Sequence, residues 1–290
     1  MIVRVPASTA NLGPGFDALG MALTIYADVI VEPIEHELEL ADAQLLDERH
    51  PGTIAFRRGG GEGPVSVRSS IPVGRGMGFS GAVRVGGLVA AHAQRHGFDT
   101  DRLQHAKPAL LHLATELEGH ADNVAASLYG GVVATAAGHA LRIPIAVDPA
   151  MVLWVPSFAT STDDSRRKLP DTVALADAVH NIGRTALLVA ALVAGDVGAL
   201  RAATEDRIHQ ELRLANAQPS RDALTTALDA GAWAAWLSGS GPSIAVMCAM
   251  DEAILIAAAL PGDGHSKVLR IDRNGAVIEK RDVKQQHQAE

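Results

Sequence analysis

Short stretches with strand-like patterns of hydrophobic and polar residues occur in both halves of the chain. They are rich in β-branched residues and alternate partly between apolar and polar positions, as half-buried strands do. Turn-forming residues separate most of them. These patterns predict strands at residues 2–6, 25–32, 65–69, 132–136, 141–147, 151–155, 233–236, 244–248 and 267–271.

Helical spacing of apolar residues lies between these strands. In residues 104–118, Leu110, Leu111, Ala114 and Leu117 follow the three- and four-residue intervals of a helix face, which ends at a glycine. Further helices are predicted at 82–96, from about 122 to 130, and within 172–203. Because strands and helices interleave without a strict βαβ rhythm, the sequence predicts an α+β fold.

The length and composition suit two domains with a packed core. The chain has 290 residues, of which 48% are hydrophobic, 20% charged and only 3% aromatic. Small aliphatic side chains therefore fill the core, and disorder is a poor interpretation. The turn at Asp148 and Pro149, just before a strand-like stretch, predicts a boundary between a domain at 1–148 and a second at 149–290.

The charge pattern excludes some classes of partner. Asp and Glu number 33 against 25 Lys and Arg, a net charge of −8, and the basic residues form no block. We expect no nucleic-acid partner, because phosphate backbones need clustered positive charge; small molecules are the expected ligands. The longest apolar run, 186–194, is shorter than the roughly 20 residues of a membrane span, so no membrane segment is predicted.

The amino terminus and the single cysteine indicate the compartment. The first residues lack the long apolar stretch of a signal peptide, which predicts a cytoplasmic protein. Cys248 lies in an apolar run and is interpreted as a core thiol. One cysteine can form neither an internal disulfide nor a thiolate zinc site.

A glycine-rich loop leading into a helix is the most informative segment. It reads Pro72-Val73-Gly74-Arg75-Gly76-Met77-Gly78-Phe79-Ser80-Gly81-Ala82. Glycines let main-chain N–H groups face a ligand, and a helix amino terminus favours anions, so a phosphate cradle is predicted. A flexible turn is the alternative. The loop also matches G-x-G-x-x-G, but no buried strand follows to hold a ribose, and no Lys follows as a Walker loop requires.

Three other segments combine small and polar residues. Residues 116–123 place two carboxylates, His120, Asp122 and Asn123 where a helix ends, which suits Mg²⁺ or a small polar substrate. Residues 6–17 form a loop with polar residues between apolar ones, and residues 237–243 form a second small-residue loop. Each signal alone is modest.

The four segments together resemble the GHMP kinase family. In order, the chain carries P-A-S-x-A-N-L-G-P-G-F-D, P-x-x-x-G-M-G-x-S, E-G-H-x-D-N and L-S-G-S-G-P-S, spanning residues 6–243. The resemblance implies a two-domain α+β fold, with an amino-terminal half like the second domain of ribosomal protein S5 and a ferredoxin-like carboxyl-terminal half. It also implies ATP-dependent phosphorylation of the side-chain hydroxyl of L-homoserine, in threonine biosynthesis, by a homodimer.

By this similarity, residues 72–82 form the ATP phosphate loop. Ser80 stands in the place of a Mg²⁺-binding serine, and Glu116 is the preferred carboxylate partner of that metal. Glu118 remains open as an alternative on ligand geometry.

The resemblance also implies a substrate pocket. Arg166 and Arg213 fall in segments similar to two substrate-arginine motifs, and a guanidinium grips an amino-acid carboxylate in bidentate fashion. Asn11, Arg166 and Asn123 are the predicted catalytic residues, with Asn123 in a positioning role because an amide cannot take a proton. The predicted substrate-binding residues are Asn11, Asp17, His120, Asp122, Asn123, Arg166 and Arg213.

One residue departs from the family loop, and other functions stay open. Phe79 stands where a serine is usual, which removes a hydrogen-bond donor to phosphate. Another small alcohol such as L-threonine could be the acceptor, since selectivity for one methyl group is worth only about 1–3 kcal/mol. A nucleotide-binding homologue without turnover is another alternative. A nucleotide-dependent oxidoreductase is disfavoured by the missing ribose-binding strand.

Overall fold

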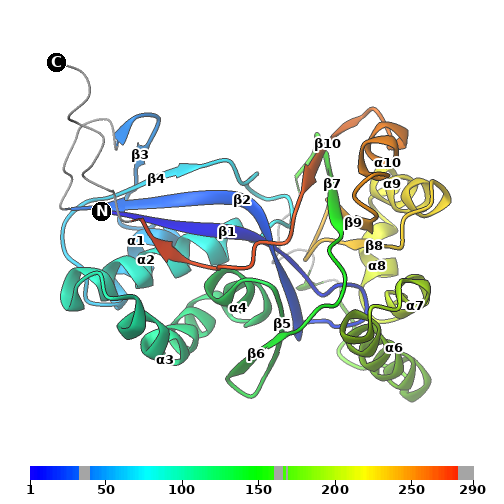
Figure 1. Cartoon of the computed structure of the whole chain (residues 1–290), viewed down its shortest axis with the longest axis horizontal. Helices are drawn as coiled ribbons and strands as arrows, with labels where there is room; N and C mark the ends of the chain where they lie inside the picture. The colour runs from blue at the N-terminus through cyan, green and yellow to red at the C-terminus, as the bar shows by residue number, and fades with distance from the viewer. Residues whose placement is uncertain (33–39, 160–165, 168, 280–290) are drawn as a thin grey trace.

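Two antiparallel sheets, each covered by helices, organise the molecule (Figure 1). The computed structural model describes residues 1–32, 40–159, 166, 167 and 169–279. The first half of the chain supplies six strands of a seven-stranded sheet, whose seventh strand, β11 (Val277–Ile278), comes from the end of the chain, and the second half supplies a four-stranded sheet. A continuous hydrophobic core runs between them, since it includes Val5 of the first half together with Leu153 and Trp236 of the second.

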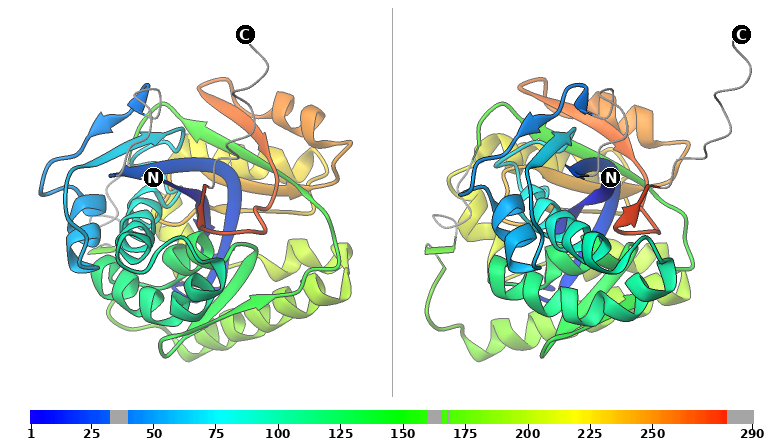
Figure 2. Two further views of the ribbon diagram at one scale, coloured as in Figure 1. Left: turned by 60° about the vertical axis from the view of Figure 1, so that its left-hand side comes forward. Right: turned by 90° about the vertical axis from the view of Figure 1, so that its left-hand side faces the viewer.

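The seven-stranded sheet has the order β11-β1-β2-β4-β3, with β5 paired to β2 and β6 to β5. Helices α1 to α4 gather on one side of it, and Figure 2 shows α2 and α3 in front of the blue strands. The elements of this half are β1 (Ile2–Ala10), β2 (Leu19–Val31), β3 (Gln44–Leu45), α1 (Pro51–Arg58), β4 (Val65–Ser69), α2 (Phe79–His96), α3 (Thr100–Glu118), α4 (Asp122–Tyr129), β5 (Val132–Ala136) and β6 (His139–Ile143).

β1 is buried on both of its faces because it lies at the junction of the two halves. Helices α2 and α4 cover one face. On the other side, Trp236 Nε1 of the second half donates a hydrogen bond of 3.0 Å to Thr9 Oγ1. A strand covered on both faces is apolar nearly throughout rather than alternating. Near its start, Arg4 forms an ion pair of 2.9 Å with Asp28, and its end leads directly into the loop at 11–17.

The four-stranded sheet has the order β10-β7-β9-β8. From β7 the chain passes through helices to the β8–β9 hairpin, then through α10 to β10, which is the βαββαβ order of a ferredoxin-like fold. The elements are β7 (Ala150–Pro156), α6 (Leu175–Ala194), α7 (Val197–Ala203), α8 (Gln210–Leu214), α9 (Gln218–Asp229), β8 (Ala234–Leu237), β9 (Ile244–Cys248), α10 (Ala253–Ala259) and β10 (Gly264–Leu269).

After β10 the chain returns to the first sheet. Ile271 forms a β-bridge with Leu23, and β11 (Val277–Ile278) pairs with the edge of β1. The segment covers a strand edge that would otherwise expose unpaired backbone groups. The predicted second domain, 149–290, thus contains a segment that belongs to the sheet of the first.

Most predicted elements are present with shifted ends. The helix expected at 82–96 begins at Phe79, and the helical region 172–203 is two helices separated at Gly195, which adopts φ +76°. The sequence analysis missed α1, a helix of eight residues whose low apolar content gave no clear periodic signal. The α+β prediction and the two-half organisation are confirmed.

Helix α6 is long and apolar enough to cross a membrane by length and composition alone, the one such helix in the described ranges. One helix of this kind is weak evidence for a span. It buries Leu188 and Leu192 in the core, and Arg184 Nη2 forms an ion pair of 2.7 Å with Glu205. The absence of a membrane partner stays a prediction.

Candidate active site

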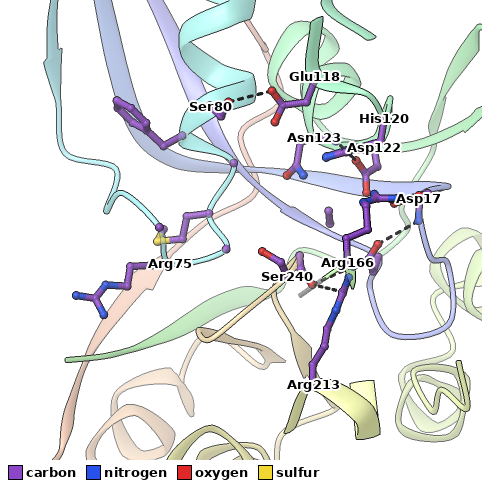
Figure 3. Close-up of a pocket in the computed structure, with 18 of the residues that line it drawn as sticks. Asp17, Arg75, Ser80, Glu118, His120, Asp122, Asn123, Arg166, Arg213 and Ser240 are labelled. Atoms are coloured by element: carbon purple, nitrogen blue, oxygen red, sulfur yellow. Dashed lines mark hydrogen bonds and ion pairs between the residues drawn. The ribbon is translucent and has the colours of Figure 1, made fainter. Parts of the chain in front are cut away.

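A pocket between the two halves collects residues from all four sequence motifs (Figure 3). The loop after β1, the glycine loop before α2, the turn between α3 and α4, and the loop after β8 each contribute. The pocket is lined by Ala10, Asn11, Phe16, Asp17, Pro72, Val73, Gly74, Arg75, Gly76, Met77, Gly78, Phe79, Ser80, Glu118, His120, Asp122, Asn123, Arg166, Arg213, Gly239 and Ser240.

The glycine loop lines the pocket, and its glycines pack closely against Ser8 and Ser238. Gly76 and Gly78 adopt φ +72° and +66°, a region that favours glycine. A Cβ at Gly78 would lie 2.1 Å from Ser8 Oγ, and one at Gly76 would lie 2.1 Å from the Ser238 carbonyl oxygen. Because Gly78 is the N-cap of α2 and has no side chain, the first N–H groups of the helix are not capped by it. An anion can bind there.

Ser80 and Glu118 meet at the start of α2. Ser80 Oγ lies 3.0 Å from Glu118 Oε2 and donates to it, and Arg84 Nη1 contacts both oxygens. A hydroxyl and a carboxylate side by side form a pair of hard oxygen ligands of the kind Mg²⁺ binds. The sequence analysis did not identify Arg84, which follows Ser80 by one helical turn.

Glu116, the carboxylate preferred from the sequence, lies elsewhere. It is half exposed and contacts Arg58 Nη2 at 3.5 Å and His112 Nε2 at 3.2 Å, and it does not line the pocket. Two positions along a helix correspond to a rotation of about 200°, so Glu116 and Glu118 point to opposite sides of α3. The structure therefore places Glu118, the alternative left open by the sequence, beside Ser80, and places Glu116 outside the pocket.

The loop after β1 is fixed by Asn11, whose two side-chain polar atoms are both used inside the protein. Its Nδ2 donates to the Gly239 carbonyl at 3.0 Å, and its Oδ1 accepts from the Asp17 backbone N–H at 3.1 Å. Asn11 has φ +71° and is 3% exposed. Asn11 therefore joins the two halves of the chain and fixes the backbone of Asp17.

Asp17 and Arg166 form a bidentate ion pair at one end of the pocket. Arg166 Nη1 and Nη2 lie 2.8 Å and 2.7 Å from the two carboxylate oxygens. The ring of Phe16 lies 5.5 Å from the Arg166 guanidinium carbon and 5.4 Å from that of Arg213. An aromatic face attracts both cations and brings two guanidinium groups near each other.

Arg213 is held by groups that the sequence analysis missed. Its Nη1 donates to the Gly239 carbonyl at 3.0 Å and lies 3.1 Å from His209 Nδ1. His209 is fully buried, and its Nε2 lies 2.8 Å from the Gly13 carbonyl oxygen. That oxygen can only accept, so Nε2 carries the proton and Nδ1 accepts from Arg213. A histidine four residues before the arginine on a helix was the available signal.

Burial shifts the pKa of both groups downward. Burial, reinforced by the charge of Arg166, lowers the pKa of Arg213 to about 10. Burial also lowers the pKa of His209, and the nearby carboxylate of Asp206 only partly offsets it. The imidazole is therefore neutral near pH 7, as its two hydrogen bonds require.

His120 and Asp122 line the pocket near Asp17. His120 Nδ1 lies 2.6 Å from Asp122 Oδ1, which also accepts the Asn123 backbone N–H at 2.7 Å. Burial lowers the pKa of His120, but the hydrogen bond and charge of Asp122 outweigh this effect, so the pKa is raised. Ligand atoms of Asp17, His120 and Asp122 lie within 4.8 Å of one another, close enough to hold one cationic group.

Asn123 faces the glycine loop. Its Oδ1 accepts a hydrogen bond of 2.8 Å from Ser8 Oγ, and the same atom would lie 2.9 Å from a Cβ at Gly78. Asn123 is 9% exposed. The pocket thus brings together all the residues predicted for the substrate pocket and, from the phosphate loop, residues 72–80. Gly81 and Ala82 are buried in α2 and do not line the pocket.

Comparison with known proteins identifies the family. The family model for the GHMP kinases N terminal domain matches residues 43–131, and that for the GHMP kinases C terminal matches residues 188–265. The homoserine kinase of Streptomyces coelicolor is 39% identical over 95% of this chain and 93% of its own length. The chain belongs to the GHMP kinase family. A homoserine kinase of Thermus thermophilus is 38% identical to this GHMP kinase, over 92% of this chain and 94% of its own.

Solved structures agree with the family. The homoserine kinase of Cytophaga hutchinsonii superposes on this GHMP kinase with a TM-score of 0.80 at 26% identity, covering 95% of this chain and 96% of the other. The mevalonate kinase of Methanococcus jannaschii, 12% identical, covers 93% of this chain and 98% of its own with a TM-score of 0.68, a likeness of fold alone.

Proposed function

We propose that this GHMP kinase transfers the γ-phosphoryl group of ATP to the side-chain hydroxyl of L-homoserine, forming O-phospho-L-homoserine in threonine biosynthesis. The observation that carries the proposal is one pocket with two different ends. An uncapped helix amino terminus lies at one end, and paired arginines and carboxylates lie at the other. The homoserine kinases at 38–39% identity support the choice of acceptor.

The arginine end fits a zwitterionic amino acid. Arg166 and Arg213 offer guanidinium groups to a carboxylate, and Asp17 and Asp122 offer carboxylates to an ammonium group. The Asp17–Arg166 pair is internally neutral, and a zwitterion is neutral too. The amino acid can therefore exchange partners with that pair without leaving either charge unpaired.

The glycine-loop end fits the phosphates of ATP. The backbone of residues 74–78 and the first turn of α2 supply N–H groups and a positive field. Ser80 and Glu118 are the residues that would hold Mg²⁺, and their oxygens fit such an ion. When bound, the ion would neutralise charge on the phosphate oxygens.

Positioning supplies the catalysis. The transition state of phosphoryl transfer is loose, so orientation and charge stabilisation do most of the work. Asn123 cannot accept a proton, and with its Oδ1 bonded to Ser8 it offers Nδ2 as a donor near the loop. Asn11 acts by holding Asp17 and the Gly239 loop in place. Arg166 touches the amino acid, not the transferred group.

Coupled measurement of ADP release tests the proposal. The full chain is supplied with ATP, Mg²⁺ and, in turn, L-homoserine, L-threonine and mevalonate. We expect turnover with homoserine at a kcat/KM at least 10-fold above that with threonine, since threonine is an isomer whose hydroxyl lies on the β-carbon rather than the γ-carbon and is therefore displaced from the transferred phosphoryl group. Faster turnover of another alcohol contradicts the choice of acceptor, and nucleotide binding without turnover of any supports a binding protein.

We further propose that the protein is a cytoplasmic homodimer. Helix α6 offers an apolar surface for assembly, with Leu175, Val179 and Ile182 exposed by 80%, 58% and 70%. Light scattering coupled to size exclusion measures the assembly directly. Ile182→Glu is expected to weaken a dimer that uses this face, with Ile254→Glu on α10, 69% exposed, as the control.

A further inference from the structure

Arg84 lies at the point where the nucleotide end of the pocket would take a metal ion. It follows Ser80 by one turn on α2, and its Nη1 contacts both Ser80 Oγ and Glu118 Oε2. The side chains of Arg84 and Glu118 are only 19% and 10% exposed. The guanidinium of Arg84 therefore already neutralises the Glu118 carboxylate, which Mg²⁺ would bind.

The guanidinium has hydrogen-bond donors to spare. It carries five N–H groups in a planar fork, of which Nη1 serves Ser80 and Glu118. Its Nε is buried, and in the described part of the chain it has no hydrogen-bond partner. Buried donors are nearly always paired, and the two residues that this guanidinium contacts, Ser80 and Glu118, line the pocket, so we look to a ligand bound there for the missing acceptor.

The loop lacks a donor that Arg84 can replace. Phe79 occupies the first position of α2, where the family resemblance leads one to expect a serine hydroxyl. Its ring lies edge-on to the ring of His50, with centroids 6.1 Å apart, and cannot donate to phosphate. Arg84, one turn further along α2, brings both N–H donors and positive charge to Ser80.

We propose that Arg84 is a phosphate-binding residue of this kinase, whose guanidinium stays on Glu118 and donates to phosphate oxygens of the bound nucleotide. The proposal rests on the proposed ATP site but not on the identity of the alcohol. It implies that the site carries part of its positive charge in the protein, so that nucleotide binds appreciably without a divalent metal. Arginine suits this role because it is always charged and its fork matches phosphate geometry.

Nucleotide affinity with and without metal tests the role of Arg84. The full-length protein is titrated calorimetrically with a non-hydrolysable ATP analogue, once in EDTA and once in excess Mg²⁺. Arg84→Met is expected to weaken binding in EDTA by at least 10-fold, and to weaken it less in Mg²⁺, because the metal then gains free access to Ser80 and Glu118. Arg84→Lys should lie between, since it keeps the charge but loses the fork.

Two further variants separate this role from a structural one. Arg95→Met, near the far end of the same helix, is the matched control and should bind as the wild type does in both buffers. Arg84→Met combined with Glu118→Gln leaves no buried carboxylate unpaired, so it should fold and still show the loss in EDTA. Thermal unfolding of each variant checks the fold.

The outcomes are distinct. Unchanged binding of Arg84→Met in EDTA overturns the proposal, and so does tighter binding in Mg²⁺ with no loss in EDTA, which would make Arg84 a competitor of the metal only. A wild type that binds no nucleotide in either buffer contradicts the ATP site itself. A 10-fold loss in EDTA supports Arg84 even if homoserine proves not to be the acceptor.

Discussion

Asp17 and Arg166, 149 positions apart in the sequence, face each other through two hydrogen bonds of 2.7 Å and 2.8 Å. The pair joins the loop after β1 to the second half of the chain across the pocket (Figure 3). The carboxylate of a bound amino acid can take the place of Asp17 on Arg166, and its ammonium group can take the place of Arg166 on Asp17. Substrate recognition therefore depends on both residues together.

Replacing Asp17 by Asn should raise the KM for homoserine about 10- to 100-fold, because a hydrogen bond to a charged group contributes about 1.5–3 kcal/mol. The KM for ATP should stay within about 2-fold, since Asp17 lies away from the glycine loop. Steady-state kinetics with each substrate varied in turn measures both. An equal rise in the two KM values would count against a substrate role for Asp17.

Replacing Glu118 by Gln should reduce kcat on the order of 100-fold at a fixed Mg²⁺ concentration, because a ligand oxygen of the metal is lost. Replacing Glu116 by Gln is the matched control and should leave kcat within about 2-fold, as its contacts with Arg58 and His112 are exposed and worth little. The reverse pattern would restore Glu116 as the ligand.

Replacing Gly78 by Ala should weaken ATP binding and destabilise the fold. The left-handed backbone costs about 1–2 kcal/mol, and the new Cβ meets Ser8 Oγ. Gly97→Ala is the control, since Gly97 has φ +82° but no atom within 4 Å of its Cβ. Chemical denaturation should show a cost for both variants, whereas only Gly78→Ala should raise the KM for ATP.

Replacing His209 by Gln should make the free energy of unfolding less dependent on pH below about pH 6.5. The folded protein lowers the pKa of His209 by burial, so below pH 6.5 the unfolded chain binds the proton first. Stability is then lost as pH falls below 6.5, by up to about 1.4 kcal/mol per pH unit until the folded pKa is reached. Urea denaturation from pH 7.5 to 5 measures it; equal slopes in the two proteins would contradict a neutral buried imidazole.

The same variant should affect Arg213. Without His209, the guanidinium of Arg213 keeps its hydrogen bond to the Gly239 carbonyl but loses the one to Nδ1, and Phe16 loses its ring contact with His209. The KM for homoserine should therefore rise several-fold with kcat less affected. Arg207→Gln, an exposed arginine on the same segment, serves as the control.

Replacing Asn123 by Ala should lower kcat by less than about 10⁴-fold, because an amide that only positions groups contributes less than a general base together with its partners. Asn123→Asp should also lower kcat, since a carboxylate beside the phosphate loop repels the nucleotide. A fall of more than about 10⁴-fold in the kcat of Asn123→Ala, with unchanged KM, would contradict the positioning role.

Local patterns in the sequence determined much of this protein. The run of glycines before an apolar helix predicts the phosphate cradle, because glycine readily adopts the left-handed φ of +72° and +66° found at Gly76 and Gly78 and has no Cβ to clash with the packed neighbours there. Four ordered motifs indicated the family, and strand and helix periodicities indicated an α+β chain with two halves. These features depend on residues close together in the chain.

Tertiary structure alone decided which side chains meet. The sequence favoured Glu116 over Glu118 as the ligand, and only the packing of α3 against α2 shows that Glu118 is the one that reaches Ser80. Only folding reveals the return of β11 to β1 and the contact of Arg84 with Glu118. Short sequence motifs encode backbone conformation and residue chemistry, whereas these contacts arise from the packing of elements brought from distant parts of the chain.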